Sequence, residues 1–594
     1  MKKLGIVSLA VMLGTVSVAK AITTNNSTTL NEVVVTATRV KEPLKSVTSV
    51  VDVVNSKKIS QENPVFLVNV LREVPSIFIT QNGVGGTANL SIRGTGNGRT
   101  LVMIDGVPVY DVISTSEGDF SFFLPLLDTT GIGKIEVVEG PVSVLYGSGA
   151  MGGVVNLIPK TIKTSGAEVK AEIGSYSTFK EGATVKEVSS KGSSFVSVSK
   201  TDIQGFSKTY SEPDKDPYHN LNLAGKIVYT PSLKHQISLT SFYLTNYQNL
   251  DGWDKETSGS FGFFDLVDNY QVNKMWKTVT KVAYSSTIRS YDNGGGSVYK
   301  GRLWYMSLQN DLKLTKNFTT ILGIDYKLER GETNGTDESA YQKSLYGEGI
   351  LKLDKAVING GIRYTKHKTA GSKVLYNLGV AVFPLEGIKV HSTLGTSFRA
   401  PSIYQLYSSY GNKTLSPEKG FGADLGVTFY NSKASFDVTG FYNKIKDEIG
   451  FNMTTWKYVN SGSFKVLGVE ARATYEFEKG LKGYTYYTYI YRKNLDTNKI
   501  DKTFPKYKVG IGLSYSFLNK GDFWINGVYV DKYFDSSNHK LGNFLVVNTG
   551  VDYALTSNIT LFGKVNNLFD KKYEEIYDYQ MPRFSIYAGV KVKF

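Results

Sequence analysis

The chain has 594 residues, of which 13% are aromatic, and it contains 39 Tyr, 59 Gly and no Cys, with a formal net charge of +15 at pH 7. The lack of cysteine excludes a disulfide framework and any thiolate metal site. The basic residues are scattered without an Arg-rich run, which disfavours nucleic-acid binding, and the wealth of Tyr and Gly favours many short strands over a helix-rich soluble enzyme.

The N-terminus has the three parts of a secretory signal. Lys2 and Lys3 supply positive charge, residues 4–18 form an apolar stretch, and Ala19 and Ala21 provide the small residues that a signal peptidase reads. An inner-membrane anchor is the weaker alternative, because this stretch is too short to span a bilayer. We therefore predict a signal peptide at residues 1–21 and an exported protein that is either soluble or a β-barrel.

A short β-branched run follows the predicted cleavage site. Residues 22–29 read ITTNNSTT, and residues 30–39 read LNEVVVTATR. Such a segment near a free N-terminus can stay mobile and add as a strand to the exposed sheet edge of a partner protein. The alternative is an ordinary first strand of the domain that follows.

Residues 41–160 mix predicted helix, strand and Gly-rich turns. The Asp-Gly pair at residues 105–106 lies between apolar runs and predicts a tight hairpin turn. Five stretches of this region have distinctive patterns: VLREVPSI at 70–77, LSIRG at 90–94, LVMIDGVP at 101–108, IEVVEGP at 135–141 and LYGSGAMGGVVN at 145–156.

After residue 160, predicted strands and turns alternate to the last residue. In residues 584–594 apolar and polar side chains alternate, with Lys591 and Lys593 on the polar face, and residues 318–329 and 467–477 show the same period of two. One apolar and one charged face suit a wall between lipid and a wet lumen. A soluble β-sandwich is the alternative, but about 430 residues of repetition favour a barrel, since so large a sandwich should divide into domains.

The length of this second region predicts roughly 20 to 22 strands, at about 20 residues for each strand and its connection. Short connections such as residues 518–521 should face the periplasm, and long polar ones such as 204–219 and 246–269 should lie outside the cell. A barrel of that size encloses a lumen too wide for its own side chains to fill, so the region before residue 160 is the available stopper.

Further patterns occur in the second region. They are FRAPSIYQLY at 398–407, a Gly-Asn pair at 411–412 before PEK at 417–419, GVE at 468–470, VNNLFDKKY at 565–573 and a terminal Phe594. With the five earlier stretches, and in the same order, they resemble the plug and barrel of TonB-dependent outer-membrane receptors. The resemblance covers nearly the whole mature chain.

The resemblance implies a membrane all-β fold: an antiparallel transmembrane barrel of about 22 strands with an N-terminal α+β plug inside its lumen. The expected boundaries are a signal peptide at 1–21, a periplasmic tail at 22–40, a plug at 41–160 and the barrel at 161–594. A monomer in the outer membrane of a Gram-negative bacterium is expected, in contact with lipid and lipopolysaccharide. The expected partners are TonB with its ExbB–ExbD motor and a small-molecule nutrient, and no nucleic acid.

The resemblance also assigns roles to residues. The TonB-binding segment, or Ton box, is expected at Glu32, Val33, Val34, Val35, Thr36 and Ala37. Ion pairs between plug and barrel are expected to involve Arg93, Glu470, Arg472 and Glu476, with solvated lumen charges as the alternative. Glu139 replaces a residue that is often basic in the family, which leaves the usual plug-to-barrel pairing at that position open.

The plug stretches ITQNG at 79–83 and IRGT at 92–95 look most like the cobalamin receptor subgroup, so a corrinoid is the first expected substrate and a ferric siderophore the alternative. Candidate substrate contacts are Asn82, Tyr110, Tyr404, Tyr407 and Tyr410. In that subgroup calcium orders acidic loops, which makes Asp202, Asp214 and Asp216 candidate calcium ligands, with Asp251, Asp254, Asp265 and Asp268 in the next loop.

Two other functional classes remain alternatives. A passive porin would have neither a Ton box nor a separate plug. A secreted enzyme is not expected, because the sequence has no nucleophile elbow and no His-Glu-x-x-His motif.

Overall fold

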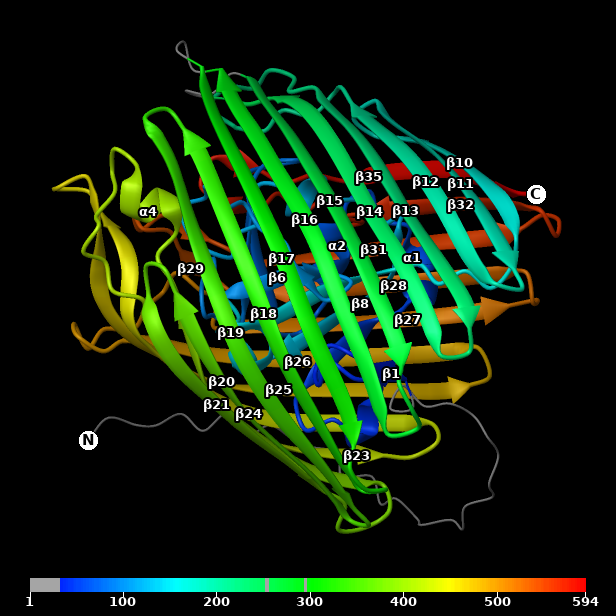
Figure 1. Cartoon of the computed structure of the whole chain (residues 1–594). Helices are drawn as coiled ribbons and strands as arrows, with labels where there is room; N and C mark the ends of the chain where they lie inside the picture. Colours follow the sequence, from blue (N-terminus) through cyan, green and yellow to red (C-terminus); the bar gives the residue numbers. More distant parts are fainter. Residues whose placement is uncertain (1–31, 252–255, 293–295) are drawn as a thin grey trace, which may run out of the picture.

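A computed structural model describes residues 32–251, 256–292 and 296–594, and a closed antiparallel barrel dominates it (Figure 1). The predicted fold class is confirmed, whereas the predicted signal peptide lies outside the described residues. The barrel contains 22 strands: β10 Gly166–Gly174, β11 Thr178–Ser189, β12 Gly192–Ile203, β13 Tyr218–Ser232, β14 His235–Asn249, β15 Glu256–Gln271, β16 Trp276–Asp292, β17 Ser297–Lys313, β18 Phe318–Thr333, β19 Thr336–Leu353, β20 Ala356–His367, β21 Gly371–Val382, β22 Ile388–Arg399, β23 Glu418–Tyr430, β24 Ala434–Asn452, β25 Lys457–Glu478, β26 Leu481–Asn494, β27 Tyr507–Phe517, β28 Gly521–Val530, β31 Phe544–Ala554, β32 Ile559–Asn566 and β35 Ser585–Lys593.

The two ends of the strand series join and close the cylinder. Strand β10 pairs antiparallel with β35, with Val169 opposite Val592. Closure leaves no free sheet edge, so every backbone polar group within the wall can be paired, as a lipid surrounding requires.

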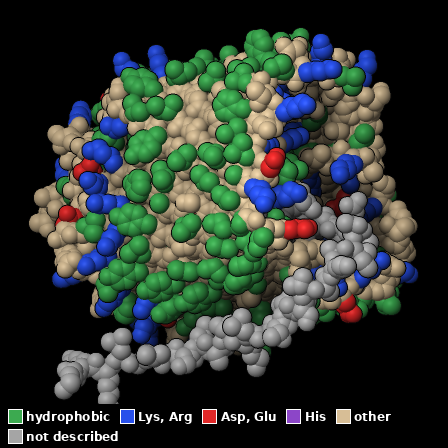
Figure 2. Space-filling model, turned by 90° about the horizontal axis from the view of Figure 1, so that it is seen from below, with side chains coloured by type: hydrophobic (Ala, Val, Ile, Leu, Met, Phe, Trp, Pro, Cys, Tyr) green, Lys and Arg blue, Asp and Glu red, His purple; other side chains and the backbone are tan. Residues whose placement is uncertain are grey.

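The two faces of the wall differ as the period-two pattern predicts. In β35, Ile586 points outward and is 56% exposed, whereas Lys591 points inward and donates to the carbonyl of Ser60 in the plug. Figure 2 shows hydrophobic side chains spread across the outer surface, with Lys and Arg mainly toward its borders. None of the helices within the described ranges is long and apolar enough to cross a membrane.

A mixed five-stranded sheet forms the centre of the plug inside the barrel (Figure 1). Its strand order is β3 Val51–Val54, β8 Ile132–Glu139, β9 Gly153–Pro159, β6 Thr100–Ile104 and β7 Val107–Pro108. The predicted hairpin turn joins β6 to β7, where Asp105 and Gly106 both have the positive φ of a two-residue turn. The remaining plug elements are the hairpin of β4 Ile77–Gln81 and β5 Ala88–Ile92, helices α1 Ser56–Glu62, α2 Leu67–Leu71 and α3 Ser143–Tyr146, and the 3-10 turns η2 Leu44–Ser46 and η3 Leu124–Leu126.

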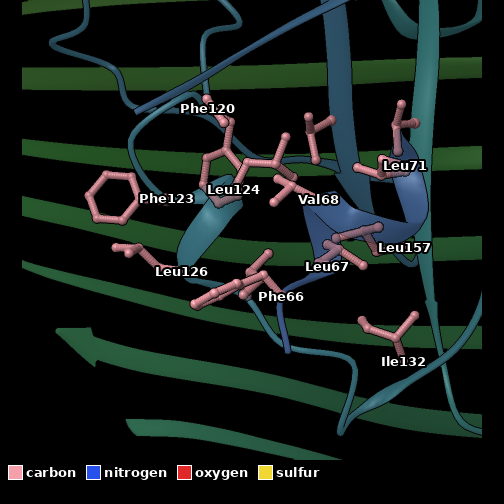
Figure 3. Packing of buried hydrophobic residues seen from close by; sticks show 14 of the residues in the cluster. Phe66, Leu67, Val68, Leu71, Phe120, Phe123, Leu124, Leu126, Ile132 and Leu157 are labelled. Atoms are coloured by element: carbon pink, nitrogen blue, oxygen red, sulfur yellow. The ribbon is translucent and has the colours of Figure 1, made fainter. Parts of the chain in front are cut away.

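The main hydrophobic core joins the plug to one side of the barrel. Leu67, Val68 and Leu71 of α2 pack with Phe120, Phe123 and Leu124 (Figure 3). The core continues into the wall, where the ring of Phe261 on β15 lies 5.1 Å from that of Phe120. Burial of several large apolar side chains, at about 1.5–3 kcal/mol each, therefore holds the plug as a packed body.

Small elements cover the extracellular end of the barrel. Ser402 caps the N-terminus of helix α4 Ile403–Tyr407, and its hydroxyl accepts from the backbone of Gln405 in a capping box. Two short hairpins lie in later loops: β29 Tyr533–Phe534 with β30 Lys540–Leu541, and β33 Glu574–Ile576 with β34 Tyr579–Gln580. The predicted long loop at 246–269 is wrong in its extent, because β14 continues to Asn249 and β15 begins at Glu256.

Candidate functional site

The expected TonB-binding segment lies against the plug. Val33 and Val34 form β1 and pair with Pro43 and Glu42 of β2 Glu42–Pro43, while the backbone of Leu44 donates to the carbonyl of Glu32. Val34 and Thr36 are 0% and 1% exposed, and Ala37 is buried as well. The sequence suggested a mobile strand, whereas in this structure the segment is docked.

A single buried carboxylate of β8 holds the middle of the segment. Oε2 of Glu136 accepts from the backbone of Val35 at 3.1 Å, and from the backbone and hydroxyl of Thr36 at 2.8 and 2.5 Å. Lys134 lies 2.6 Å from the other carboxylate oxygen of Glu136 and balances its charge. Hydrogen bonds to a charged acceptor are stronger than neutral ones, so Glu136 acts as a latch on the segment.

Hydrogen bonds of residues near Glu136 link the docked segment to the extracellular end of the barrel. The hydroxyl of Tyr146, in α3, donates to the carbonyl of Thr36 at 2.7 Å. Two residues further on, the hydroxyl of Ser148 accepts a hydrogen bond of 2.9 Å from the backbone of Ala400. Ala400 is the first residue after β22. Helix α3 and the residues that follow it therefore contact both the docked segment and the FRAP stretch of the sequence.

Arg39 ties the end of the segment to the barrel. Its guanidinium donates to the hydroxyl of Tyr346 on β19 at 2.6 Å and to the carbonyl of Leu145. The same group lies over the rings of Tyr146 and Tyr346, 4.8 and 4.7 Å from their centroids. Undocking of the segment must therefore break contacts to both plug and barrel.

Three of the four expected plug–barrel ion-pair residues meet in one buried network, which we call the Arg93 cluster. Arg93 in the plug lies 2.8 Å from Glu470 on β25 and 2.5 Å from Glu139 in the plug. Arg472, two residues along β25, pairs with Glu139 as well and lies 3.0 Å from Glu470. Glu139, whose pairing the sequence left open, therefore joins a plug arginine to a barrel arginine.

Glu476 does not belong to this network. It lies near the periplasmic end of β25, 3.3 Å from the ammonium of Lys482 on the neighbouring strand, and its side chain is 34% exposed. Within the described ranges it has no plug contact, because β25 extends past the plug at this end. The sequence-based assignment of Glu476 is corrected accordingly.

A second buried network explains two of the barrel motifs. Glu418 of the PEK stretch accepts two hydrogen bonds from Arg399 of the FRAP stretch, at 2.9 and 2.5 Å. Arg99 in the plug makes the same two-pronged contact with Glu418, at 2.8 and 2.7 Å. One carboxylate between two guanidinium groups binds the plug to β23 with strong geometric specificity.

The substrate-contact candidates in the plug have different surroundings. Tyr110 is 1% exposed and donates its hydroxyl to Glu329 on β18, so it is a plug–barrel contact and not an open binding residue. Burial, with a smaller effect of Glu329, raises the pKa of the Tyr110 hydroxyl, so that it stays protonated. Asn82 is half-buried at the tip of the β4–β5 hairpin.

The barrel candidates Tyr404 and Tyr410 belong to a chain of ring contacts near α4, which we call the aromatic patch. Its centroid distances run from 5.1 to 6.3 Å, and Tyr410 and Trp456 are 39% and 56% exposed. Arg289 lies 3.9 Å from the Tyr299 centroid and forms an ion pair with Asp111 of the plug. Tyr407 lies beside the patch, with Lys413 over its ring. The members of the patch are Tyr291, Tyr299, Tyr404, Tyr410, Phe451, Trp456 and Tyr458.

The structure changes the expected set of calcium ligands. Oxygens of Asp214, Asp216 and Asp251 lie within 4.8 Å of one another, so Asp251 joins the set. Asp202 does not, because it pairs with Lys200 at 2.7 Å and His219 at 2.6 Å.

The three carboxylates suit the oxygen preference of Ca²⁺, but some of their oxygens already have partners. Asp216 accepts from the backbone of Lys208 at 2.7 Å, and Asp251 accepts from Thr209 at 2.6 Å. Burial raises the pKa of Asp216 and lowers that of Lys208. The residues present therefore fit a calcium ion only in part.

Comparison with protein families agrees with this architecture. The model of the TonB-dependent receptor-like β-barrel matches residues 204–568, and that of the TonB-dependent receptor plug domain matches residues 43–154. The chain belongs to the TonB-dependent receptor family. As a member of this family, the receptor is a transporter of the Gram-negative outer membrane, and its transport depends on TonB.

Solved structures of receptors share the fold at low sequence identity. The ferric enterobactin receptor PfeA of Pseudomonas aeruginosa has a TM-score of 0.81 and 18% identity, covering 95% of this chain and 100% of its own. The siderophore receptor PirA of Acinetobacter baumannii has a TM-score of 0.80 and 17% identity, covering 93% and 99%. The copper transporter OprC has a TM-score of 0.80 and 16% identity, covering 92% and 98%. These likenesses establish the fold and do not single out a cobalamin receptor.

Sequence reasoning missed several residues of the site. Glu136 lies within the IEVVEGP stretch, but nothing in that stretch signals a contact with a residue 100 positions earlier in the chain. Arg99 has no distinctive motif, although Arg399 and Glu418 lie within recognised stretches. Asp251 was named only as one of several acids in the next loop, because a turn and two strands separate it from Asp214 and Asp216 and the spacing does not single it out.

Proposed function

We propose that this receptor imports a metal chelate of the ferric-siderophore class across the outer membrane. The observation that carries the proposal is the aromatic patch beside α4, which joins exposed rings to a fixed guanidinium above the plug. Exposed ring faces suit a bulky chelate with aromatic groups. The siderophore receptors among the similar structures are consistent with this class.

A corrinoid is the second candidate substrate, and the acidic cluster favours it. Asp214, Asp216 and Asp251 come from two adjacent extracellular loops, as expected for loops that calcium would order. Under this alternative, Ca²⁺ would bridge the two loops and strengthen the binding of the substrate.

Energy for import has to reach the plug from the periplasm, through the docked segment. Ligand binding near Ala400 would bias the contacts of α3, and α3 holds Thr36 through Tyr146. Coupling of this kind requires that the ligand bind the receptor more tightly when the segment is undocked than when it is docked. We infer that substrate weakens the seat of residues 33–37 and makes them available to TonB.

Isothermal titration calorimetry of the purified receptor tests the substrate class. The panel is a ferric catecholate chelate, a ferric hydroxamate chelate and cyanocobalamin, each with and without Ca²⁺. We expect saturable heat with a ferric chelate, and about two- to tenfold weaker binding in Trp456→Ala, because an aromatic contact contributes about 0.5–1.5 kcal/mol.

The matched control is Phe569→Ala, which removes a 69%-exposed ring from a loop outside the aromatic patch and should bind as the native receptor does. Saturable heat with cyanocobalamin that requires Ca²⁺, and none with either chelate, would replace the siderophore by the corrinoid.

A further inference from the structure

A large cavity lies between the plug and the periplasmic half of one barrel wall. Its volume is about 680 Å³, and it extends from the turn at Leu233, Lys234 and His235 up to the plug hairpin at Asp105. Inward-facing residues of β13 to β17 form its outer wall. On the plug side, Val35 and Thr36 of the TonB-binding segment form part of its lining. We call this cavity the basic chamber.

The lining of the basic chamber is strongly cationic. One carboxylate, that of Asp105, faces six basic side chains: Arg39, Lys41, Lys226, Lys234, Lys277 and Lys281. Lys226 pairs with the Asp105 carboxylate, and Lys281 donates to the Asp105 carbonyl at 2.6 Å. Lys41, Lys234 and Lys277 form no ion pair within the described parts of the chain, although Asp311 on β17 lies opposite Lys277 and offsets part of its charge. Lys41 and Lys234 are exposed.

The other large cavity at the plug–barrel boundary has balanced charges. Its volume is about 160 Å³, and it lies between α1 and α2 of the plug and strands β27 to β35. Three carboxylates and three cations line it: Glu62, Glu73, Glu575, Arg72, Lys508 and Lys564. The excess of positive charge therefore belongs to the basic chamber and does not follow from the basic composition of the whole chain.

The position of the basic chamber relates it to transport. Concave walls of low dielectric constant focus the potential of the charges that line them, and so raise the local concentration of the opposite ion. The TonB-binding segment closes part of the chamber, so withdrawal of residues 35–39 would enlarge it. The plug hairpin at Asp105, held by Lys226 and Lys281, separates the chamber from the packed core above.

We propose that the basic chamber is the last stage of the import route, and that its cations draw an anionic chelate toward the periplasm when the TonB-binding segment is withdrawn. This inference rests on the proposed function and adds to it that the cargo carries net negative charge while it crosses. A neutral cargo would gain nothing from such a lining.

The lack of native cysteine allows a direct test of the potential inside the chamber. Val279→Cys places a single thiol on the inner face of β16 in the basic chamber, and Val546→Cys places a matched thiol in the balanced cavity. Each variant is labelled with an anionic sulfonatoethyl methanethiosulfonate and with a cationic trimethylammonium methanethiosulfonate. The ratio of the two reaction rates reports the local potential.

We expect the anionic-to-cationic rate ratio at Val279→Cys to exceed that at Val546→Cys by about tenfold at low salt. Adding Lys277→Gln should lower the ratio, and so should 0.5 M salt, because ions screen exposed charges. Equal ratios at the two positions would overturn the proposal. This measurement needs no substrate, so its outcome is independent of the calorimetric panel.

The route itself is tested with a ferric chelate that gives saturable heat in the panel. Lys277→Glu should slow energised uptake of an anionic chelate several-fold while surface binding stays unchanged, and Lys277→Arg should restore uptake. Unaltered uptake by Lys277→Glu would show that the cargo does not pass the chamber. A failure of every chelate to bind would instead reject the proposed function and leave the rate ratios standing.

Discussion

Deletion of residues 32–37 should reduce energised import to background while ligand binding at the cell surface stays within about twofold of the native value. The deletion removes the strand that TonB would grip through main-chain hydrogen bonds, but it leaves the aromatic patch and the loops intact. Uptake of a radiolabelled ligand by intact cells, with binding measured in de-energised cells, separates the two effects.

Two control variants accompany the deletion. Removal of residues 24–28, which precede the segment, should leave import unchanged. Val34→Pro keeps the chain length but removes a backbone donor from β1, and it should abolish import as the full deletion does. Import that survives both the deletion and Val34→Pro would contradict the assignment of the segment, and continuous leakage would indicate a passive pore.

Arg93→Ala should destabilise the plug by about 3–5 kcal/mol, because it leaves the two buried carboxylates of Glu139 and Glu470 to share one cation, Arg472. Both carboxylates have completely buried side chains. The lower stability of the plug should appear as faster amide hydrogen exchange in the plug strands β8 and β5, while exchange in the barrel strands changes little.

The matched control is Glu476→Gln on the same barrel strand as Glu470. Its carboxylate pairs with Lys482 at a partly exposed position, so its loss should cost less than about 1 kcal/mol. If Arg93→Ala and Glu476→Gln had equal effects on plug exchange, the Arg93 cluster would contribute nothing to the seat of the plug.

The sequence predicts the barrel well because its physical signal is local. A lipid-facing strand must alternate every second residue, so Ile586 and Lys591 can be assigned to opposite faces from residues 584–594 alone. The extent of β14 and β15 could not be predicted in the same way. Above the membrane both faces of a hairpin are wet, so polar residues there do not mark the end of a strand.

The candidate site is only partly predictable, because its contacts join residues that are distant in the chain. Arg93, Glu470 and Arg472 were identified as charges on facing elements, whereas Glu476 was not separated from them, since alternation gives the face of a strand and not the height at which the plug ends. Tyr110 was expected at a binding surface, but it lies two residues after β7 and contacts Glu329 on β18. The latch at Glu136 depends on the tertiary fold alone.

A reversible cross-link tests most directly whether import requires the TonB-binding segment to leave its seat. The side chains of Thr36 and Asn156 contact each other at 2.8 Å, and the chain has no other cysteine to compete. In Thr36→Cys/Asn156→Cys, the oxidised receptor should bind its ligand but fail to import it, and reduction should restore import. Equal import by the oxidised and reduced forms would contradict the requirement for undocking.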